Sequence, residues 1–291
     1  MKRILLTLLC LPLLALSQCV LGDCENGYGV SKEENGDVFS GEWLNGKKNG
    51  YGYLEINSGG YYIGEFRNNN FEGFGYFVLP DGNLYFGELK DSQKSGYGYF
   101  EYPDEVGIYR GVFKLDDRHG IGVYADKTSD KTKYYMGSFL NDEPKMKPKK
   151  KVISGCLAGK CSKGREGVFV GDNIVIGKWE KKKISGIGLL ESGNDMCIGE
   201  FKDGTVDGLA LYFWGSTQEL YLGSFIAGNT NFGHTLLKRN DGEVYIGESS
   251  SSYVNNGKGV SVVQQKNKPN EYFIGTWKNG KVVEVESYIL K

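Results

Sequence analysis

The sequence YIGEFRNNNFEGFG, residues 62–75, contains one full unit of a phrase that recurs along most of the chain. The unit opens with aromatic-x-Gly-Glu-aromatic and continues, nine residues after its first glycine, with Gly-x-Gly. Opening glycines are 23, 23, 24 and 26 residues apart in a first series and 22, 24, 24 and 28 apart in a second: Gly41, Gly64, Gly87, Gly111 and Gly137, then Gly177, Gly199, Gly223, Gly247 and Gly275. Fixed periods of this length predict a repeat architecture, so we interpret the chain as an array of like units.

The residues that define the repeat are its glycines and the aromatic residues that close the opening phrase. They are Gly41, Trp43, Gly50, Gly64, Phe66, Gly73, Gly87, Gly96, Gly111, Phe113, Gly120, Gly177, Trp179, Gly186, Gly199, Phe201, Gly208, Gly223, Phe225, Gly247, Gly275 and Trp277. The second series departs from the pattern more often. Val175 and Cys197 replace the opening aromatic residue, Ser249 replaces a closing one, and Ala210 and His234 stand where a second glycine is expected.

Each unit has the pattern of two short strands and two turns. Side chains alternate along a strand, so Tyr62, Gly64 and Phe66 share one face while Ile63 and Glu65 share the other. Glycine inside a strand costs roughly 0.5–1 kcal/mol relative to alanine, so repeated strand glycines need a reason. We infer that a ring lies over the bare backbone and that the rings form rows along the array. The fold class predicted is all-β: an elongated, twisted single-layer antiparallel sheet of repeated β-hairpins, without helices.

Composition agrees with a β-rich repeat and restricts the partners. The 291 residues include 44 Gly and only 6 Pro, with 20 Tyr and 15 Phe, and aromatic residues favour strands. The formal net charge of −1 argues against a nucleic-acid partner.

The N-terminus has the pattern of an export signal. Lys2 and Arg3 precede an apolar run from Ile4 to Leu16, and Ala15-Leu16-Ser17 resembles a cleavage site. We therefore predict a signal peptide at residues 1–17 and an exported, mildly acidic protein of bacterial type. The predicted location is the periplasm, the cell envelope or the extracellular space.

A C-x-x-G-x-C element occurs twice, as Cys19 to Cys24 and as Cys156 to Cys161. It divides the chain into a first array at 18–140, a joint at 141–155 and a second array at 156–291. In an oxidising compartment, cysteines five residues apart around a glycine can close a small disulfide, so we predict two local bridges, leaving Cys197 buried and unpaired. The alternative is a lipoprotein acylated at Cys19, because Leu16-Ser17-Gln18-Cys19 resembles a lipobox, although Gln18 is larger than the residue usually found there.

The joint carries a basic patch of Lys145, Lys147, Lys149, Lys150 and Lys151, interrupted by two prolines. Proline cannot donate to a strand ladder and like charges repel, so one interpretation is an exposed, extended linker. The other is attraction to an anionic membrane surface, since each cation near such a surface contributes up to ~1 kcal/mol.

No motif with a catalytic mechanism occurs, so we do not expect an enzyme, a cofactor or a metal site. The two histidines, His119 and His234, lack metal-type partner spacing, and the Gly-x-Gly repeats lack the following helix of a phosphate cradle. The recurrent glutamates are interpreted as facing away from the rings and pairing with lysines or turn amides: Glu42, Glu65, Glu88, Glu200 and Glu248.

The phrase Y-x-G-E-F/W followed by G-x-G resembles the MORN repeat (membrane occupation and recognition nexus), and the resemblance extends from about Gly27 to Trp277. It implies a protein-assembly module, a lipid-binding module or both. We therefore expect an envelope-associated scaffold that binds a protein partner or a second copy of itself, with a peripheral membrane protein as the alternative. Edge strands near Gly29 and Tyr288 are the expected templates for end-to-end association, with Val282, Val283 and Val285 in the last strand.

Overall fold

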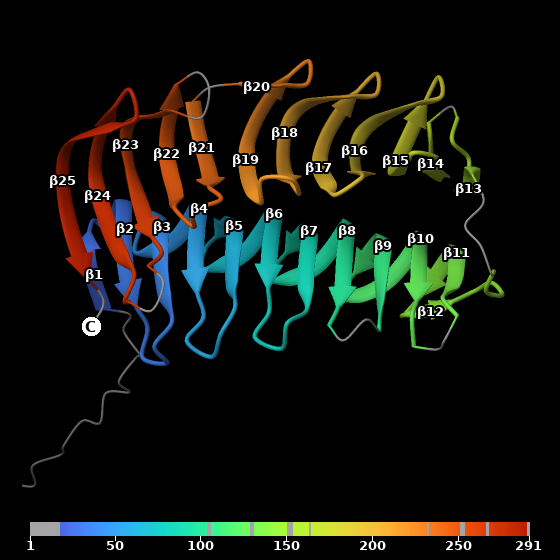
Figure 1. The fold of residues 1–291 in the computed structure, drawn as a ribbon, viewed down its shortest axis with the longest axis horizontal. Helices are drawn as coiled ribbons and strands as arrows, with labels where there is room; N and C mark the ends of the chain where they lie inside the picture. The colour runs from blue at the N-terminus through green and yellow to red at the C-terminus, as the bar shows by residue number, and fades with distance from the viewer. Residues whose placement is uncertain are drawn as a thin grey trace, which may run out of the picture.

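The computed structural model describes residues 18–103, 106–128, 131–149, 154–162, 164–231, 233–250, 254–265 and 268–289. These residues contain no helix and form two antiparallel sheets (Figure 1), so the all-β prediction is confirmed. The predicted signal peptide, residues 1–17, and two lysines of the predicted basic patch, Lys150 and Lys151, lie outside the described residues.

The first sheet contains twelve strands in sequence order. They are β1 (Gln18–Gly22), β2 (Asn26–Lys32), β3 (Val38–Leu44), β4 (Lys47–Glu55), β5 (Tyr61–Arg67), β6 (Asn70–Val78), β7 (Leu84–Lys90), β8 (Gln93–Tyr102), β9 (Gly107–Lys114), β10 (Asp117–Asp126), β11 (Lys133–Leu140) and β12 (Glu143–Pro144). Every strand pairs with the one before it, so the sheet is a chain of hairpins.

The second sheet contains thirteen strands, with β20 paired beside the main path to β19. They are β13 (Gly155–Gly159), β14 (Arg165–Val170), β15 (Asn173–Glu180), β16 (Lys183–Ser192), β17 (Asp195–Lys202), β18 (Thr205–Trp214), β19 (Glu219–Ile226), β20 (Asn229–Thr230), β21 (Gly233–Lys238), β22 (Val244–Ser250), β23 (Val254–Val263), β24 (Glu271–Lys278) and β25 (Lys281–Ile289).

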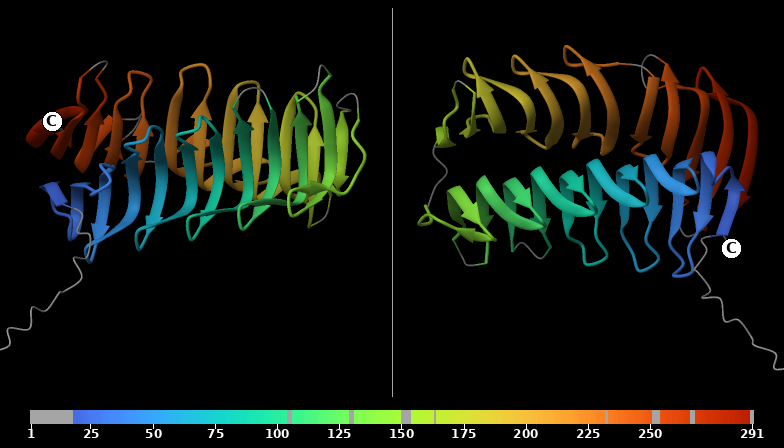
Figure 2. Two further views of the ribbon diagram at one scale, coloured as in Figure 1. Left: turned by 90° about the horizontal axis from the view of Figure 1, so that it is seen from below. Right: turned by 180° about the vertical axis from the view of Figure 1, so that it is seen from behind.

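The two sheets lie face to face, which differs from the expected single layer. The chain reverses after β12, so β13 contacts β11 at one end and β25 contacts β1 at the other (Figures 1 and 2). One continuous core fills the space between them and includes Ile63 and Phe86 from the first sheet and Ile198 and Leu236 from the second, all 0% exposed. The physical reason is that the face opposite the ring row is also apolar, so each sheet needs a partner to cover it.

The ring row lies on the other face of each sheet, as the sequence predicts. Gly64 and Gly75 are paired across β5 and β6, and the Tyr62 ring lies over both. A Cβ at either glycine would be 2.3–2.4 Å from that ring or its hydroxyl. The fully buried Tyr62 hydroxyl donates to the Glu65 carbonyl at 3.1 Å, so its polar atom is satisfied. Glycine is therefore required because the ring occupies the space of a side chain.

The glutamate of the phrase binds the backbone where the ladder is interrupted. A register shift follows Gly64, and the carboxylate of Glu65 accepts the freed N–H of Phe74 at 2.8 Å. Glu42 and Glu88 accept N–H groups from Tyr51 and Tyr97 in the same way, at 2.6 Å each. Burial raises the pKa of Glu88 to about 6. The sequence predicted lysines or turn amides as the partners of these glutamates, whereas in these three units the glutamates accept backbone N–H groups of the following strand.

Neighbouring hairpins are also joined at their turns. The N–H of Asn69 donates to the Lys48 carbonyl at 3.0 Å, and the Lys48 N–H donates to the Asn69 side chain at 2.9 Å. The same pair of bonds joins Asp116 to Lys94 and Asp142 to Arg118. Each turn residue lies one repeat further along the chain, so these bonds hold consecutive repeats at a fixed spacing.

Candidate interaction surfaces

The two cysteine elements are closed by disulfides, as predicted. Cys19 is bonded to Cys24 and Cys156 to Cys161, and the Cα atoms of each pair are 5.9 Å apart. The mid-loop glycines, Gly22 and Gly159, have φ of +72° and +67°. At either position a Cβ would collide with a carbonyl of the neighbouring strand, so the tight loop needs glycine. Cys197 is buried and unpaired, and burial raises the pKa of its thiol.

Each disulfide loop is followed by the same tryptophan contact. Trp43 Nε1 donates to the Gly29 carbonyl at 3.2 Å, and Trp179 Nε1 donates to the Gly167 carbonyl at 3.0 Å. The first units of both sheets therefore begin alike, although β1 and β13 stand at opposite ends of the molecule (Figure 2).

The described part of the joint packs along the end of the first sheet more closely than a free linker would. Pro144 pairs with Phe139, and Lys149 exchanges two backbone hydrogen bonds with Tyr134, at 2.7 and 3.0 Å. Met146 packs against the ring row and its Cε lies 2.7 Å from the Cβ position of Gly137. Met146 thus anchors the joint, a contact that the charge pattern did not indicate.

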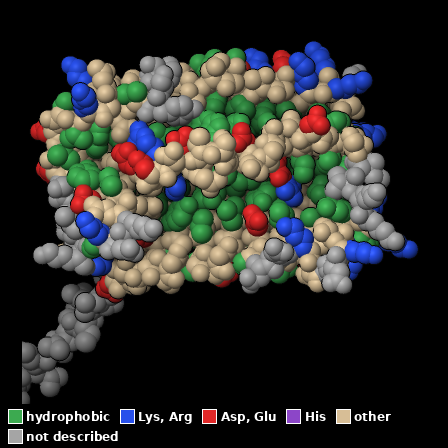
Figure 3. Space-filling view, viewed as in Figure 1, with side chains coloured by type: hydrophobic (Ala, Val, Ile, Leu, Met, Phe, Trp, Pro, Cys, Tyr) green, Lys and Arg blue, Asp and Glu red, His purple; other side chains and the backbone are tan. Residues whose placement is uncertain are grey.

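Three lysines of the predicted patch, Lys145, Lys147 and Lys149, are exposed on this packed segment. Lys145 lies 2.9 Å from Glu143. Lys and Arg side chains cluster at the right-hand end of the view in Figure 3, where Figure 1 places β10 to β16. The joint end of the molecule is therefore basic.

Polar side chains join the two sheets along their sides. His234 of β21 places Nε2 2.7 Å from Glu42 Oε1, and its ring stacks on Tyr51 with centroids 4.9 Å apart. Tyr28 lies 3.4 Å from the other ring nitrogen. Burial, with Glu65 and Glu42 nearby, raises the pKa of Tyr51 far above its ordinary value, so this phenol stays neutral. The structure corrects the expected place of His234: Thr235 pairs with Gly247 at the repeat-glycine position, and His234 is the middle residue of Gly-x-Gly. Nothing in the sequence pattern indicated its contacts with the first sheet.

Further contacts of this kind follow along the molecule. Arg110 binds Glu191 through two guanidinium nitrogens and lies over the Tyr99 ring, and Tyr97 donates to Glu166 at 3.1 Å. Glu55 accepts from Tyr272 at 3.0 Å. Charge-assisted bonds depend on geometry, so they favour one alignment of the two sheets over a shifted one.

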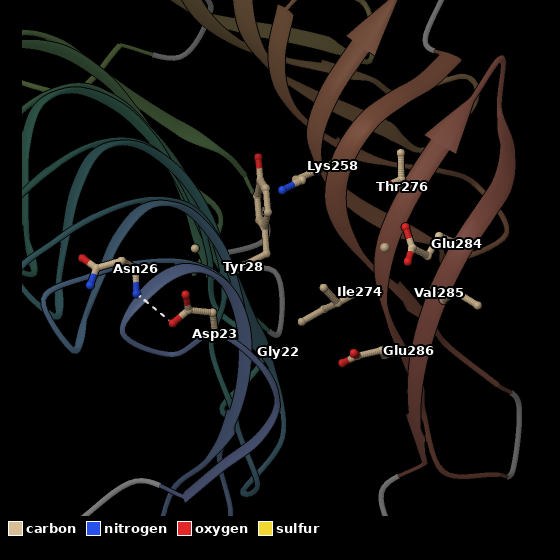
Figure 4. Close-up of a pocket in the computed structure, with 12 residues that line it drawn as sticks. Gly22, Asp23, Asn26, Tyr28, Lys258, Ile274, Thr276, Glu284, Val285 and Glu286 are labelled. Atoms are coloured by element: carbon tan, nitrogen blue, oxygen red, sulfur yellow. Dashed lines mark hydrogen bonds between the residues drawn. The ribbon is translucent and has the colours of Figure 1, made fainter.

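A cleft of about 550 Å³ opens at the terminal end, between β1–β2 and β24–β25. Figure 4 shows Asp23 on the side of the first sheet and Glu284 and Glu286 on the side of the second, with Ile274 between them. The exposed Lys258 lies beside Tyr28. The Asp23 carboxylate accepts N–H groups from Glu25 and Asn26, at 2.9 Å each. The mouth of this cleft is mainly acidic.

Neither metal-type clusters nor membrane-spanning helices occur among the residues that the structure covers. No three His, Cys, Asp or Glu side chains within that part of the chain are grouped so that they would hold a metal ion. A search of the same residues finds no helix with the length and apolar character needed to cross a bilayer.

Comparison with known proteins identifies the repeat. The family model described as the MORN repeat matches four consecutive segments, residues 39–61, 62–84, 85–105 and 109–131. No curated protein matches the chain. Among solved structures, the computationally designed Ika8 protein aligns with 95% of this chain and 96% of its own, at 10% identity and a TM-score of 0.17, which is too low to support an argument.

Proposed function

The chain is a MORN-repeat protein, and from that premise we propose that it is a non-catalytic scaffold of the cell envelope that binds proteins along a stiff two-sheet rod. The observation that carries this proposal is the hydrogen bonding between successive hairpin turns, such as that of Asn69 with Lys48. Because strands are ~4.8 Å apart, two-strand repeats would present their turns at intervals of roughly 10 Å.

Several of these turns carry exposed apolar side chains. Leu115, in the turn after β9, is 65% exposed, and three residues at strand ends next to turns, Leu44, Leu140 and Ile226, are 50%, 47% and 58% exposed. Each follows closely after a buried ring of the repeat. The equivalent positions of the intervening repeats are Arg67 and Lys90, so the apolar side chains are unevenly spaced. Exposed apolar side chains favour contact with another protein, because that contact removes them from water.

Site-specific photo-crosslinking tests the scaffold role. A photoreactive residue placed at Leu44, Leu115 or Ile226 is expected to capture the same envelope protein, because one partner that extends along the rod would contact several repeats. Lys90, an exposed polar position, and Ile63, which is 0% exposed, serve as controls. The proposal is contradicted if none of the three positions captures a protein more strongly than the buried control position Ile63.

Export is supported by the two disulfides, because such bonds persist in oxidising compartments. Intact-mass analysis of the exported protein is expected to give a chain that begins at Gln18 and lacks two hydrogens for each disulfide. A mass increased by acyl chains would instead favour the lipoprotein alternative, in which the Cys19 sulfur bonded to Cys24 would have to be free.

The membrane alternative rests on the exposed lysines of the joint end. Replacing Lys145, Lys147 and Lys149 with glutamine should abolish co-sedimentation with anionic vesicles and its salt dependence if these cations bind lipid. Unchanged sedimentation eliminates the electrostatic membrane contact.

A further inference from the structure

Among the residues that the structure describes, the sheets end in strands that have one pairing partner each. At the terminal end, β1 pairs with β2 and β25 with β24, and no other described strand pairs with them. At the joint end, β14 is the one described partner of β13, and β11 is covered by the two residues of β12 and by the bridge to Lys149. Gly29, expected at an edge, is internal because β1 pairs with it, whereas Tyr288 does lie in an edge strand. Unpaired N–H and C=O groups at an edge are templates for another strand.

The β25 edge also exposes apolar side chains. Val282, Val283 and Val285 are 48%, 60% and 44% exposed, and they lie in a strand of nine residues. Glu284 and Glu286 lie in the same strand and, as expected from the sequence, blunt the edge against a like-charged strand, so a partner must carry the opposite charge. A strand of this length with three exposed valines gains by pairing, since pairing satisfies its backbone and buries the valines.

The two ends carry opposite charges. Asp23 and Glu25 occupy the disulfide element of the terminal end, and Lys160 and Arg165 occupy or follow the same element at the joint end. Glu284 and Glu286 extend the acidic set along β25, and Lys147 and Lys149 extend the basic set. Charges of the opposite sign also occur at both ends: Lys32, Lys258, Lys278 and Lys281 at the acidic end, and Glu143, which pairs with Lys145, and Glu166, which accepts from Tyr97, at the basic end.

We propose that copies of this chain associate head to tail, with the basic joint end of one copy against the acidic cleft and β25 edge of the next. The two surfaces differ, so the contact leaves a free acidic end and a free basic end and extends into a linear chain of copies. Pairing of the β25 edge with the β13 edge of the next copy continues the second sheet across the junction, and the charges select the opposite end in place of the like one. This inference rests on the proposed scaffold function and names a second copy as its partner.

Charge reversal tests the arrangement in sedimentation velocity over a range of protein concentrations. The native protein should form species of increasing length at about 50 mM salt and fewer of them at about 500 mM. E284K/E286K alone and K147E/K149E alone should each weaken association at least tenfold. An equimolar mixture of the two variants should recover association, because each altered end then meets an end of opposite charge.

The control K90E/K202E reverses two exposed lysines in the middle of the sheets and should associate like the native protein. Recovery in the mixture also excludes misfolding as the cause of the losses.

A native protein that stays monomeric at all concentrations overturns the proposal. If E284K/E286K weakens association and K147E/K149E does not, the head-to-tail proposal is wrong and a symmetric contact between terminal ends is favoured. Anionic vesicles bound by a monomer through Lys147 and Lys149 would assign the basic end to lipid. Because the photo-crosslinking at Ile226 probes the end of β19, in the middle of the second sheet, it can succeed where this test fails.

Discussion

Equivalent glycine pairs are covered by different side chains in the two sheets. In the first sheet, Tyr85 lies over Gly87 and Gly98. In the first full hairpin of the second sheet, Val175 replaces the ring, and Ile184 from the paired strand covers Gly177, with its Cδ1 2.8 Å from the Cβ position. The glycine pair therefore needs a cover but not an aromatic one. This explains how the second sheet keeps the hairpin architecture although the family model matches only residues between 39 and 131.

The turns differ in the same way. First-sheet turns place Asn69, Asp116 or Asp142 where a side chain adds a second bond to the preceding repeat. The second sheet has Gly204 and Gly228 at corresponding turns, which keep only the backbone bonds to Ile184 and Val206, at 2.9 and 2.8 Å. The first sheet is thus held by more side-chain bonds, and the second by aliphatic packing.

Removing a ring that covers two glycines should have the largest effect on stability. Tyr62→Ala should lower the free energy of unfolding by about 3–5 kcal/mol, because it empties the space over two glycines. Cys197→Ala, at the matching position of the second sheet, should cost only about 1 kcal/mol because it removes one sulfur atom. Urea unfolding followed by tryptophan fluorescence measures both. Equal losses would show that the two sheets do not differ in how their glycines are covered.

The next largest expected effect comes from a methyl group added at a covered glycine. It should lower the free energy of unfolding more in the first sheet than in the second. Gly64→Ala places Cβ 2.3 Å from the Tyr62 hydroxyl and 2.7 Å from the Phe74 carbonyl, so we expect a loss of about 1–3 kcal/mol. Gly177→Ala meets only the flexible end of Ile184 as its nearest contact, and the lower entropy of the unfolded chain offsets part of the crowding. We expect a change within about 1 kcal/mol in the same unfolding assay. A larger loss at Gly177 than at Gly64 would contradict this account.

The phrase glutamate should give the first sheet a distinctive pH dependence. Burial raises the pKa of Glu88 from 4.5 to about 6, so the folded state holds this proton more tightly than the unfolded state. Its contribution is fully present below pH 4.5 and is lost as pH rises through 6, with a maximum of about 2 kcal/mol. Glu88→Gln should remove this part of the slope of stability against pH. The matched control is Ser224→Ala, since Ser224 occupies the same position in the second sheet and should leave the slope unchanged.

The smallest expected effect concerns a turn. Leu115 has φ of +52°, a left-handed conformation that costs a bulky residue about 1–2 kcal/mol and suits asparagine better. Leu115→Asn should therefore raise the free energy of unfolding by about 1 kcal/mol. Ala227→Asn, at φ of +48° in the second sheet, should give a similar gain. If Leu115→Asn stabilises the protein and also reduces photo-crosslinking from Leu140 on the adjacent repeat, the strained leucine serves binding.

Much of the repeat unit could be predicted because its contacts are local. Tyr62, Gly64 and Gly75 lie within one hairpin, so alternation and glycine cost were enough to infer a ring over bare backbone. The disulfides were equally accessible because each joins cysteines five residues apart. The role of Glu65 was only partly inferred, since the bulge that frees the Phe74 N–H is a detail of register.

We did not predict from the sequence that the two sheets stack, although the apolar side chains of Ile63, Phe74 and Tyr76 indicate it. These side chains lie opposite the glycine face, and a second apolar face means that one sheet alone would leave it in water. The contact of His234 with Glu42 could not be predicted from the repeat pattern, because it joins residues 192 positions apart.

The amino-acid order alone therefore specifies the hairpin, its period, its ring row and the two closed cysteine loops, because the residues involved are neighbours along the chain or across one turn. The reversal at the joint, the shared core and the meeting of β1 with β25 emerge only in the folded molecule. They depend on which apolar faces and charged groups come together after the chain has turned back, and no local pattern encodes that pairing.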